Sequence, residues 1–531
     1  MKRRLFGAET EFGLECSKDA EERLTDGKVG VKEDPAYINV ARTLPEFLEE
    51  NPLSVNDFDS LFLERCKNRG RLPEGIAERV VDGYGNSCSS YPAFVLFLQN
   101  GGKFYYDLGH TECATPECDN LIELVAYEHA MTLIFDGVVR KFSMAHPEKG
   151  VLQGYKDCTD GEMFWGSHAN YLVERSVLNE RRLKYLIPFL VTQQLFTGSG
   201  YVRDKSITPG FREFDSFWEL SPRARAIKMV LGPETTRNRA IINSRDEPFA
   251  DRKKYARLHL IHNDANMLGY TNFLKFGTTH LVLRLLEEIE EFDTSVLVNP
   301  VKDIHNVSLH PHQPLTFNGG RKMTPIEVQR KLYLEPYRKY LFGDDEQSDN
   351  VLRLWEFVLN ELEDLRTKLP LSLVGIADWV TKYEFLSQFI EADKLDPSNE
   401  KDRAKLRGCS NLYHNISVDA GLTYTSFRGE NYKPSNPAEV LNAAFNPPLS
   451  TRAGIRAFPI RFFPERISSV DWNMVVFDKG FPKLNLTECI FAEPDELREQ
   501  YSNPEFEGFK KYCYDRNMLE INKFLKYVKK N

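Results

Sequence analysis

Residues 3–15, RRLFGAETEFGLE, decide the fold because apolar and acidic positions alternate along them. Side chains of a β-strand point to opposite faces in turn, so the stretch predicts a strand with one buried and one acidic face. The buried face holds Phe6, Ala8, Thr10, Phe12 and Leu14, and the other holds Leu5, Gly7, Glu9, Glu11 and Gly13. Glu9 and Glu11 are then about 7 Å apart, a spacing that suits divalent cations bound through oxygen. A solvated strand face is the alternative interpretation.

A second acidic segment favours the cation interpretation. AFVLFLQ at 93–99, the turn NGG and KFYYDLG at 103–109 predict a β-hairpin. Carboxylates gathered in one place repel one another unless a metal, an arginine or a substrate cation compensates them. The stretch KFYYDLGHTECATPEC brings together Asp107, His110, Glu112 and Glu117.

Arginines and histidines supply the complementary groups. The segment TTRNRAIINSRDEPFAD carries Arg237, Arg239 and Arg245, and guanidinium groups bind phosphate oxygens in pairs. A structural network of ion pairs with Asp246 and Glu247 is the alternative. His168 and His259 lie in apolar, strand-like stretches. Each could be a metal ligand or a histidine of the hydrophobic core, and both interpretations stay open.

The remaining periodicity predicts helices at 121–143, 271–291 and 351–367, and another at Pro325 after a Thr324 N-cap. Strands HANYLVE and AIINS stand among them without βαβ alternation, which favours an α+β fold. We expect a catalytic domain over 1–435, with a polar insertion at about 17–90. A small C-terminal domain over 436–531 ends in a helix with an apolar stripe and a basic face, carried by Leu519, Phe524, Leu525, Val528 and intervening lysines.

Composition excludes several classes of function. With 531 residues, 41% hydrophobic and 28% charged, the chain is globular. A net charge of -9 argues against a nucleic-acid partner. No apolar run approaches the roughly 20 residues that span a bilayer, so we expect neither a secreted nor a membrane protein. Nine cysteines without a CxxC pair suit the cytoplasm. The sequence leaves the oligomeric state open.

Seven motifs together resemble the Pup ligase and Pup deamidase/depupylase family. They are GAETEFG, LQNGGKFYYD, ATPECDN, PFLVTQQLFTGSG, GSHANYL, ETTRNRAIINSRDEPFAD and NPPLSTRAGIR. The resemblance implies a glutamine-synthetase-like catalytic domain, in which a curved antiparallel sheet with flanking helices holds ATP and Mg²⁺. With no P-loop and no usable GxGxxG, ATP must be held by metals and arginines.

The resemblance also assigns roles. It implies that Asp107 is the catalytic carboxylate, that Glu9 and Glu11 contact metal or nucleotide, and that Glu112 and Glu117 complete the acidic face. Arg245 serves the phosphates, and Arg237, Arg239 and Arg452 are further candidates for nucleotide contacts. His259 precedes an AN segment, as a metal ligand does in glutamine-synthetase-like sites, and His168 is a candidate ligand as well.

The implied reaction is ATP-dependent phosphorylation of a carboxylate on a small ubiquitin-like, Pup-like protein, followed by attack of a protein lysine to form an isopeptide. A deamidase or depupylase of the same fold is the alternative. Where the family usually has HPEY, HENY, TRQ and DEPHAD, this chain has HTEC, HANY, TQQ and DEPFAD. The departures at Ala169, Gln193 and Phe249 motivate a third hypothesis, a catalytically weakened module that binds a protein tail. An ATPase or phosphatase also stays open.

Overall fold

The central strand of the molecule is β1 (Phe6–Ser17), as the alternation predicts. In the computed structural model, Phe6, Ala8, Phe12 and Leu14 are buried, whereas Glu9 and Glu11 are partly exposed on the opposite face. The structure describes residues 3–17, 35–54, 57, 95–107, 109–161, 163–206, 214–290, 293, 295–365, 367–477 and 482–519. Most of the polar insertion and the C-terminal stripe, apart from Leu519, therefore lie outside the described residues.

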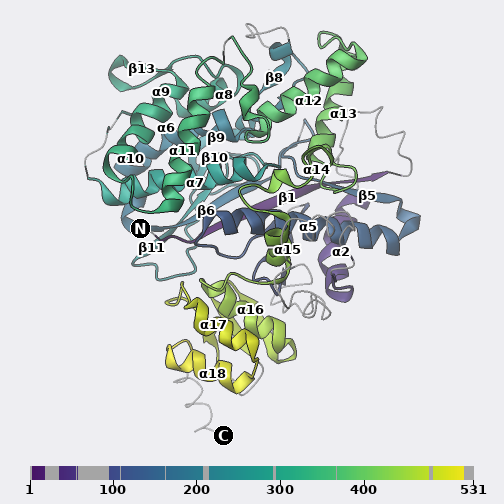
Figure 1. Ribbon diagram of the computed structural model, residues 1–531, viewed down its shortest axis with the longest axis vertical. Helices are drawn as coiled ribbons and strands as arrows, with labels where there is room; N and C mark the ends of the chain where they lie inside the picture. The colour runs from purple at the N-terminus through teal and green to yellow at the C-terminus, as the bar shows by residue number, and fades with distance from the viewer. Residues whose placement is uncertain are drawn as a thin grey trace.

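The described residues form a nine-stranded sheet in the order β2-β3-β4-β1-β6-β11-β10-β9, with β5 also paired to β1 (Figure 1). The predicted hairpin is confirmed, because β2 and β3 pair antiparallel across the turn at Asn100–Gly102. The strands that follow β1 are β2 (Val95–Phe97), β3 (Lys103–Asp107), β4 (His110–Ala114), β5 (Val151–Tyr155), β6 (Ser167–Glu174), β9 (Ile227–Gly232), β10 (Arg239–Asn243) and β11 (Tyr255–Leu260).

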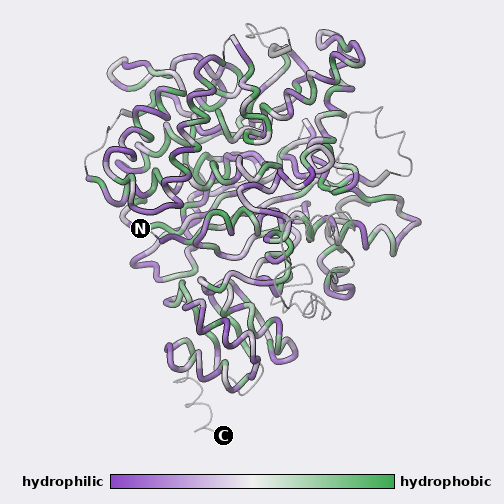
Figure 2. The backbone as a smooth tube through the Cα atoms, in the orientation of Figure 1, coloured by the Kyte–Doolittle hydropathy of each residue, from purple (hydrophilic) through white to green (hydrophobic). Residues whose placement is uncertain are grey.

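Helices cover the apolar face of the sheet. Phe12 stacks on Phe135 of α5 with ring centroids 4.2 Å apart, and Phe6 meets His280 of α7 edge-on at 5.3 Å. Hydrophobic segments gather along this layer in Figure 2. The helices of this region are α2 (Pro35–Glu50), α5 (Leu121–Ala145), α6 (Glu180–Thr197), α7 (Gly269–Glu288), α8 (Pro300–Leu309), α9 (Pro325–Gln329), α10 (Glu335–Tyr340), α11 (Glu346–Glu361), α12 (Asp378–Asp393), α13 (Glu400–His414), α14 (Leu422–Phe427) and α15 (Pro437–Phe445).

These elements confirm the α+β prediction and the four predicted helices. The Thr324 cap is also present: its side chain accepts from the backbone N–H of Glu327, and the Glu327 carboxylate accepts from the Thr324 N–H. Such reciprocal capping stabilises the first turn of a helix. No helix among the described residues is both long and apolar enough to cross a bilayer.

One strand pair departs from the expected antiparallel sheet. Strands β9 and β10 run parallel, with Arg239 opposite Ile227 and Asn243 opposite Gly232. A five-residue strand spans roughly 17 Å, and six extended residues reach about 20 Å. The short connection over 233–238 therefore has to return along the strand within six residues, and it bends at 235–238. Thr235, Thr236 and Arg237 of this connection line the cavity on the acidic face.

The C-terminal segment forms a second hydrophobic cluster below the sheet (Figure 1). It contains α16 (Arg452–Phe462), β14 (Ile467–Asp471), β15 (Met474–Phe477), β16 (Leu484–Asn485), α17 (Pro494–Ser502) and α18 (Phe506–Asp515). The last residue of the larger cluster is Phe445 of α15, and the next buried hydrophobic residue of the smaller cluster along the chain is Ile455. The domain boundary at 435 stays a prediction, and from these clusters we propose that it lies within 446–451.

Candidate active site and metal centre

A cavity of about 680 Å³ opens on the acidic face of the sheet. Most residues that the sequence proposes for the site line it together. They are Glu9, Glu11, Asp107, Glu112, His168, Arg237, Arg239, Arg245 and His259. Strands β1, β3, β4, β6, β10 and β11 supply most of them, because residues two apart on each strand face the same side.

Carboxylates line up across adjacent strands. Glu11 lies directly opposite Glu112, which lies opposite Tyr105, and such partners have Cβ atoms about 5 Å apart. Glu112 is only 3% exposed, and the Tyr105 hydroxyl donates a hydrogen bond to it. Burial raises the pKa of Glu112 well above its usual range, and the nearby charges of Glu9 and Glu11 raise it further. Negative charge is therefore concentrated here at an energetic cost.

Two imidazoles flank Glu9. Its Oε2 lies 3.2 Å from His168 Nδ1 and 3.6 Å from His259 Nε2, and the ligand atoms of all three residues fall within 4.8 Å of one another. On the other side, Arg257 Nη2 donates to Glu9 Oε1 at 3.0 Å. Burial opposes the charge on Glu9, but Arg257 and the histidines outweigh it and lower the pKa of Glu9.

Asp107 ends β3 at the mouth of the cavity, and its side chain is exposed. Loss of part of its water and repulsion by Glu11 raise the pKa of this carboxyl above its ordinary value. The position leaves Asp107 accessible to a large substrate from outside.

The three arginines of the 235–251 segment take different positions. Arg237 and Arg245 are exposed at the rim, and neither side chain forms an ion pair among the described residues. Arg239 is half-buried and donates to the Phe164 carbonyl. The alternative interpretation, a network of these arginines with Asp246 and Glu247, is not seen among the described residues. Asp246 pairs with Arg175 at 2.6 Å, and Glu247 lies 3.6 Å from Arg257.

Glu117 and Arg452 lie outside this cavity. Glu117 accepts from Arg452 Nε at 2.7 Å and from Arg456 Nη2 at 2.6 Å, so the α16 guanidiniums lower the pKa of this buried carboxyl to about 2 despite burial. The structure therefore joins Glu117 to two cations of the C-terminal segment and does not bring it to the other candidate metal ligands.

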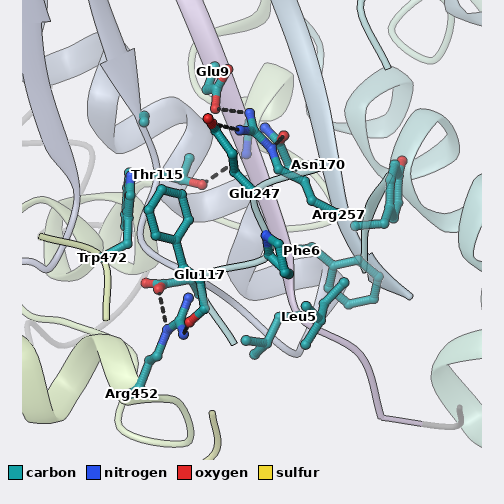
Figure 3. A pocket seen from close by; sticks show the side chains of 17 residues that line it. Leu5, Phe6, Glu9, Thr115, Glu117, Asn170, Glu247, Arg257, Arg452 and Trp472 are labelled. Carbon is teal, nitrogen blue, oxygen red and sulfur yellow. Dashed lines mark hydrogen bonds and ion pairs between the residues drawn. The ribbon is translucent and has the colours of Figure 1, made fainter. Parts of the chain in front are cut away.

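Glu117 and Arg452 instead line a second, more apolar pocket next to the cavity, shown in Figure 3. The labelled Leu5 and Phe6 lie on one side of it, and Trp472 lies on the other. The cavity and the pocket adjoin each other, because five residues line both: Glu9, Glu247, Phe249, Arg257 and Trp472.

Three residues that line the cavity were not predicted from the sequence: Arg257, Tyr105 and Trp472. Arg257 and Tyr105 each stand two residues from a predicted site residue on the same strand, so the strand period contains a signal for both. Trp472 belongs to the turn between β14 and β15 and gives no such signal.

The three residues that depart from the family pattern lie in different places in the structure. Phe249 lines the cavity, with a positive φ of 49°. Ala169 is buried on the opposite, helix-covered face of β6. Gln193 does not line the cavity: it is buried in α6, where its amide donates to the Lys275 carbonyl of α7 at 2.9 Å. Sequence proximity to a motif did not translate into proximity to the cavity.

Comparison with known proteins gives a consistent result. The family model described as Pup-ligase protein matches residues 4–476. The Pup deamidase/depupylase of Mycolicibacterium smegmatis is 32% identical over 494 residues, which cover 90% of this chain and 92% of that protein. The Pup–protein ligase of Kineococcus radiotolerans is 32% identical over 511 residues, which cover 94% of this chain and 99% of that protein.

Solved structures agree with the sequence matches. The complex between the prokaryotic ubiquitin-like protein Pup and its ligase PafA matches with a TM-score of 0.74 and 25% identity, over 99% of this chain and 95% of that one. The Pup ligase PafA in complex with ADP matches with a TM-score of 0.67 and 28% identity, over 78% and 90%.

Proposed function

The chain belongs to the Pup-ligase family, and from this premise we propose that it is an ATP-dependent ligase which joins a carboxylate of a Pup-like protein to a protein lysine. The observation that carries the proposal is one continuous cavity in which carboxylates face exposed arginines across the sheet. Phosphoryl transfer needs positioned cations around the phosphate oxygens and little else from the protein. Arg237 and Arg245 pair with no carboxylate among the described residues, so both guanidiniums can serve those oxygens.

The carboxylates fit Mg²⁺. Glu11 and Glu112 face each other on adjacent strands, and repulsion between such neighbouring carboxylates is relieved when a divalent cation lies between them. We propose that these two residues, with Glu9 nearby, hold the metal that accompanies ATP. A Mg²⁺ held by these residues would supply positive charge to the phosphate oxygens.

The apolar pocket suits the adenine base. Trp472, Phe249 and Phe6 give it aromatic and apolar sides, and the pocket joins the cavity where the phosphates would lie. A planar base gains from aromatic and apolar contact, and the pocket opens toward the charged groups at Glu9 and Arg257. One nucleotide can therefore span both, with its base against the C-terminal segment and its phosphates over the sheet.

Asp107 is the group we assign to deprotonate the lysine. A lysine amine has an ordinary pKa near 10.4 and must lose a proton before it attacks the activated carboxyl carbon. Asp107 is exposed at the cavity mouth, where a lysine on a folded protein can reach it, and its raised pKa makes it a better proton acceptor than an ordinary aspartate.

An amidohydrolase is the second candidate, because a Pup deamidase/depupylase and a Pup–protein ligase have the same 32% identity to this chain. In that reaction Asp107 supports attack on a side-chain amide, and ATP need not be consumed. We also propose a cytoplasmic location, which is supported by free cysteines throughout the described residues.

The decisive experiment supplies a Pup-like protein ending in glutamate, a lysine-bearing acceptor protein, ATP and Mg²⁺, and measures ADP and isopeptide together. A ligase forms one ADP for each isopeptide, and the conjugate weighs one water less than its two parts. The same mixture with a C-terminal glutamine tests the alternative, because release of ammonia without ADP identifies an amidohydrolase.

Two variants make the result specific. Asp107→Asn should retain ADP binding within about 3-fold and lose about 100-fold or more in rate, a typical loss for a missing general base. Asp393→Asn, an exposed aspartate at the end of α12, is the matched control and should leave the rate unchanged. Binding of the Pup-like tail with neither ADP nor ammonia formed would replace both enzymes by the tail-binding module.

A further inference from the structure

Met163 is an exposed apolar side chain at a cavity that is otherwise rich in charge. It is 54% exposed, and no other large apolar residue that the structure describes both lines this cavity and is exposed to a similar degree. Single exposed apolar residues are common on protein surfaces, so exposure by itself indicates little. Met163 differs from the others because its backbone is fixed and the residues after it pack beside Asp107.

The turn that carries Met163 is held at both of its backbone polar groups. Thr159 and Phe164 form an antiparallel bridge across the turn. Thr159 Oγ1 donates to the Met163 carbonyl at 2.5 Å, and the Met163 N–H donates to Asp160 Oδ1 at 2.7 Å. Side chains of this kind often close tight turns in this way. The Cα of Met163 therefore keeps one position relative to the strands.

Two arginines and strand β1 fasten the next three residues, 164–166, to the sheet. In chain order, the first carbonyl accepts from Arg239, the second from Arg223 Nη1 at 2.5 Å, and the third from the Glu11 N–H at 3.0 Å. Arg223 is fully buried. Hydrogen bonds from a charged donor are stronger than those between neutral groups. The segment is therefore a fixed side of the cavity.

Ring contacts connect this segment to Asp107. Trp165 stacks on His110, with ring centroids 5.2 Å apart and 27° between the planes. His110 lies directly opposite Asp107 where β3 pairs with β4, and both residues line the cavity. Met163 is only two residues from Trp165 in the chain. These contacts place Met163, His110 and Asp107 at the same end of the cavity.

We propose that Met163 and the His110 ring form a subsite for the four-carbon chain of the acceptor lysine, whose amine then lies at Asp107. The inference rests on the proposed function and names the contacts that guide its lysine. Lysine buries its methylenes along apolar surface while its amine stays with polar groups. Arginine has a similar shape but does not lose its proton in proteins, so a carboxylate that accepts a proton selects lysine.

The first test compares two acceptor peptides that differ by one methylene, one with lysine and one with ornithine. Each is joined to a Pup-like protein with ATP and Mg²⁺, and isopeptide formation gives kcat and KM. The shorter chain leaves its amine short of Asp107 and loses apolar contact. We expect kcat/KM of the wild-type protein to be about 10-fold higher for lysine, since one methylene in an apolar subsite is worth about that much or more.

Met163→Ser removes the apolar contact and keeps the backbone of the turn. It should raise the KM for the lysine peptide about 10-fold and abolish most of the preference over ornithine, with little change in kcat, as expected for a contact made before and during reaction. Met163→Leu should restore the preference. Met144→Ser, a methionine at the end of α5 that is 76% exposed and does not line the cavity, is the matched control. Equal losses for both peptides, or a loss of affinity for ATP or the Pup-like protein instead, would overturn the inference.

Binding of butylammonium, which reproduces the lysine side chain, gives a readout that needs no turnover. The full-length protein is labelled with ¹³C at its methionine methyl groups, and the Met163 signal is the one missing from Met163→Leu. Butylammonium should shift this signal at concentrations where ethylammonium does not, and Asp107→Asn should abolish the shift. An unmoved Met163 signal would overturn the inference.

The two readouts separate the subsite from the ligase. A shifted Met163 signal in a protein that forms no isopeptide supports the subsite and contradicts the ligase. Isopeptide formation that uses lysine and ornithine equally leaves the ligase standing and removes the subsite.

Discussion

Arg257 binds Glu9 across two strands, 248 residues apart in sequence, with 3.0 Å between Nη2 and Oε1. Its Nε donates to Asn170 at 2.7 Å, which fixes the guanidinium plane. Both side chains are largely buried. Arg257 therefore acts as an internal counter-ion for the Glu9 carboxylate, which also lies near two histidines and the carboxylates of Glu11 and Glu112.

Replacing Arg257 should make the protein depend on metal for stability. Arg257→Gln leaves Glu9 uncompensated, so we expect the free energy of unfolding to fall by about 1–3 kcal/mol without metal. The rise in melting temperature on adding a divalent cation should be larger than in wild type, because the cation replaces the lost charge. Arg175→Gln, which breaks the partly exposed pair with Asp246, is the control. Equal metal-induced shifts in Arg257→Gln and wild type would contradict this role.

Glu117→Gln should reduce stability and leave metal binding intact. The substitution leaves Arg452 and Arg456 buried without an anion, and breaking such a pair costs about 3–5 kcal/mol. Urea unfolding measures the loss, and Co²⁺ titration of the folded variant measures metal affinity. Glu507→Gln, in an exposed pair with Lys510 of the same segment, should cost less than about 1 kcal/mol. A folded Glu117→Gln protein that no longer binds metal would restore Glu117 as a ligand.

Arg245→Gln should weaken nucleotide binding without affecting the fold. The side chain is exposed at the cavity rim and forms no ion pair among the described residues, so nothing in the fold depends on its charge. Loss of one charged contact to phosphate, about 1.4 kcal/mol, corresponds to a roughly 10-fold higher Kd for ADP. Calorimetric titration measures it, alongside an unchanged melting temperature. Arg252→Gln, on an exposed position of the same connection, should bind ADP like wild type.

Stability should fall as pH rises from about 4 to 7, partly because of Asp157. Burial raises the pKa of this carboxyl from 3.8 to about 7, although Lys382 opposes the shift. Asp157 Oδ1 accepts no hydrogen bond from any residue that the structure describes. The folded state therefore holds this proton more tightly than the unfolded chain. The contribution is complete below pH 4 and is lost by pH 7, by at most about 4 kcal/mol.

The neutral variant isolates this effect. Asp157→Asn cannot ionise and so lacks this loss of stability. The free energy of unfolding of the variant minus that of wild type should therefore increase between pH 4 and 7 and stay constant above pH 8. Urea denaturation at four pH values gives both curves. Parallel curves for the two proteins would show that Asp157 does not titrate in this range.

Structural features that depend only on neighbouring residues could be predicted from the sequence. Alternation along residues 3–15 predicts both faces of β1, and the Thr324 cap with Pro325 and Glu327 predicts the start of α9. These signals depend on a strand period of two and on hydrogen bonds within one turn, which neighbouring residues alone determine.

The site itself depended on distant partners. Glu117 looks like its neighbour Glu112 in sequence, and only Arg452 and Arg456, more than 300 residues later, turn it away from the acidic face. The direction of β10 beside β9 also follows from packing and not from local pattern. Gln193 shows the converse, since a residue inside a family motif is used by the helix core.

Trp472 lines the pocket proposed for adenine from the C-terminal cluster, and Arg456 donates to both the Trp472 carbonyl and Glu117. If adenine binds there as proposed, nucleotide affinity becomes a measure of how firmly the C-terminal segment is attached to the sheet. Binding free energies that share a contact are reciprocal, so a nucleotide that needs Trp472 must tighten the attachment of the C-terminal segment by the same amount. Protection of that segment from proteolysis should therefore increase with ADP concentration in proportion to the fraction of protein that has ADP bound.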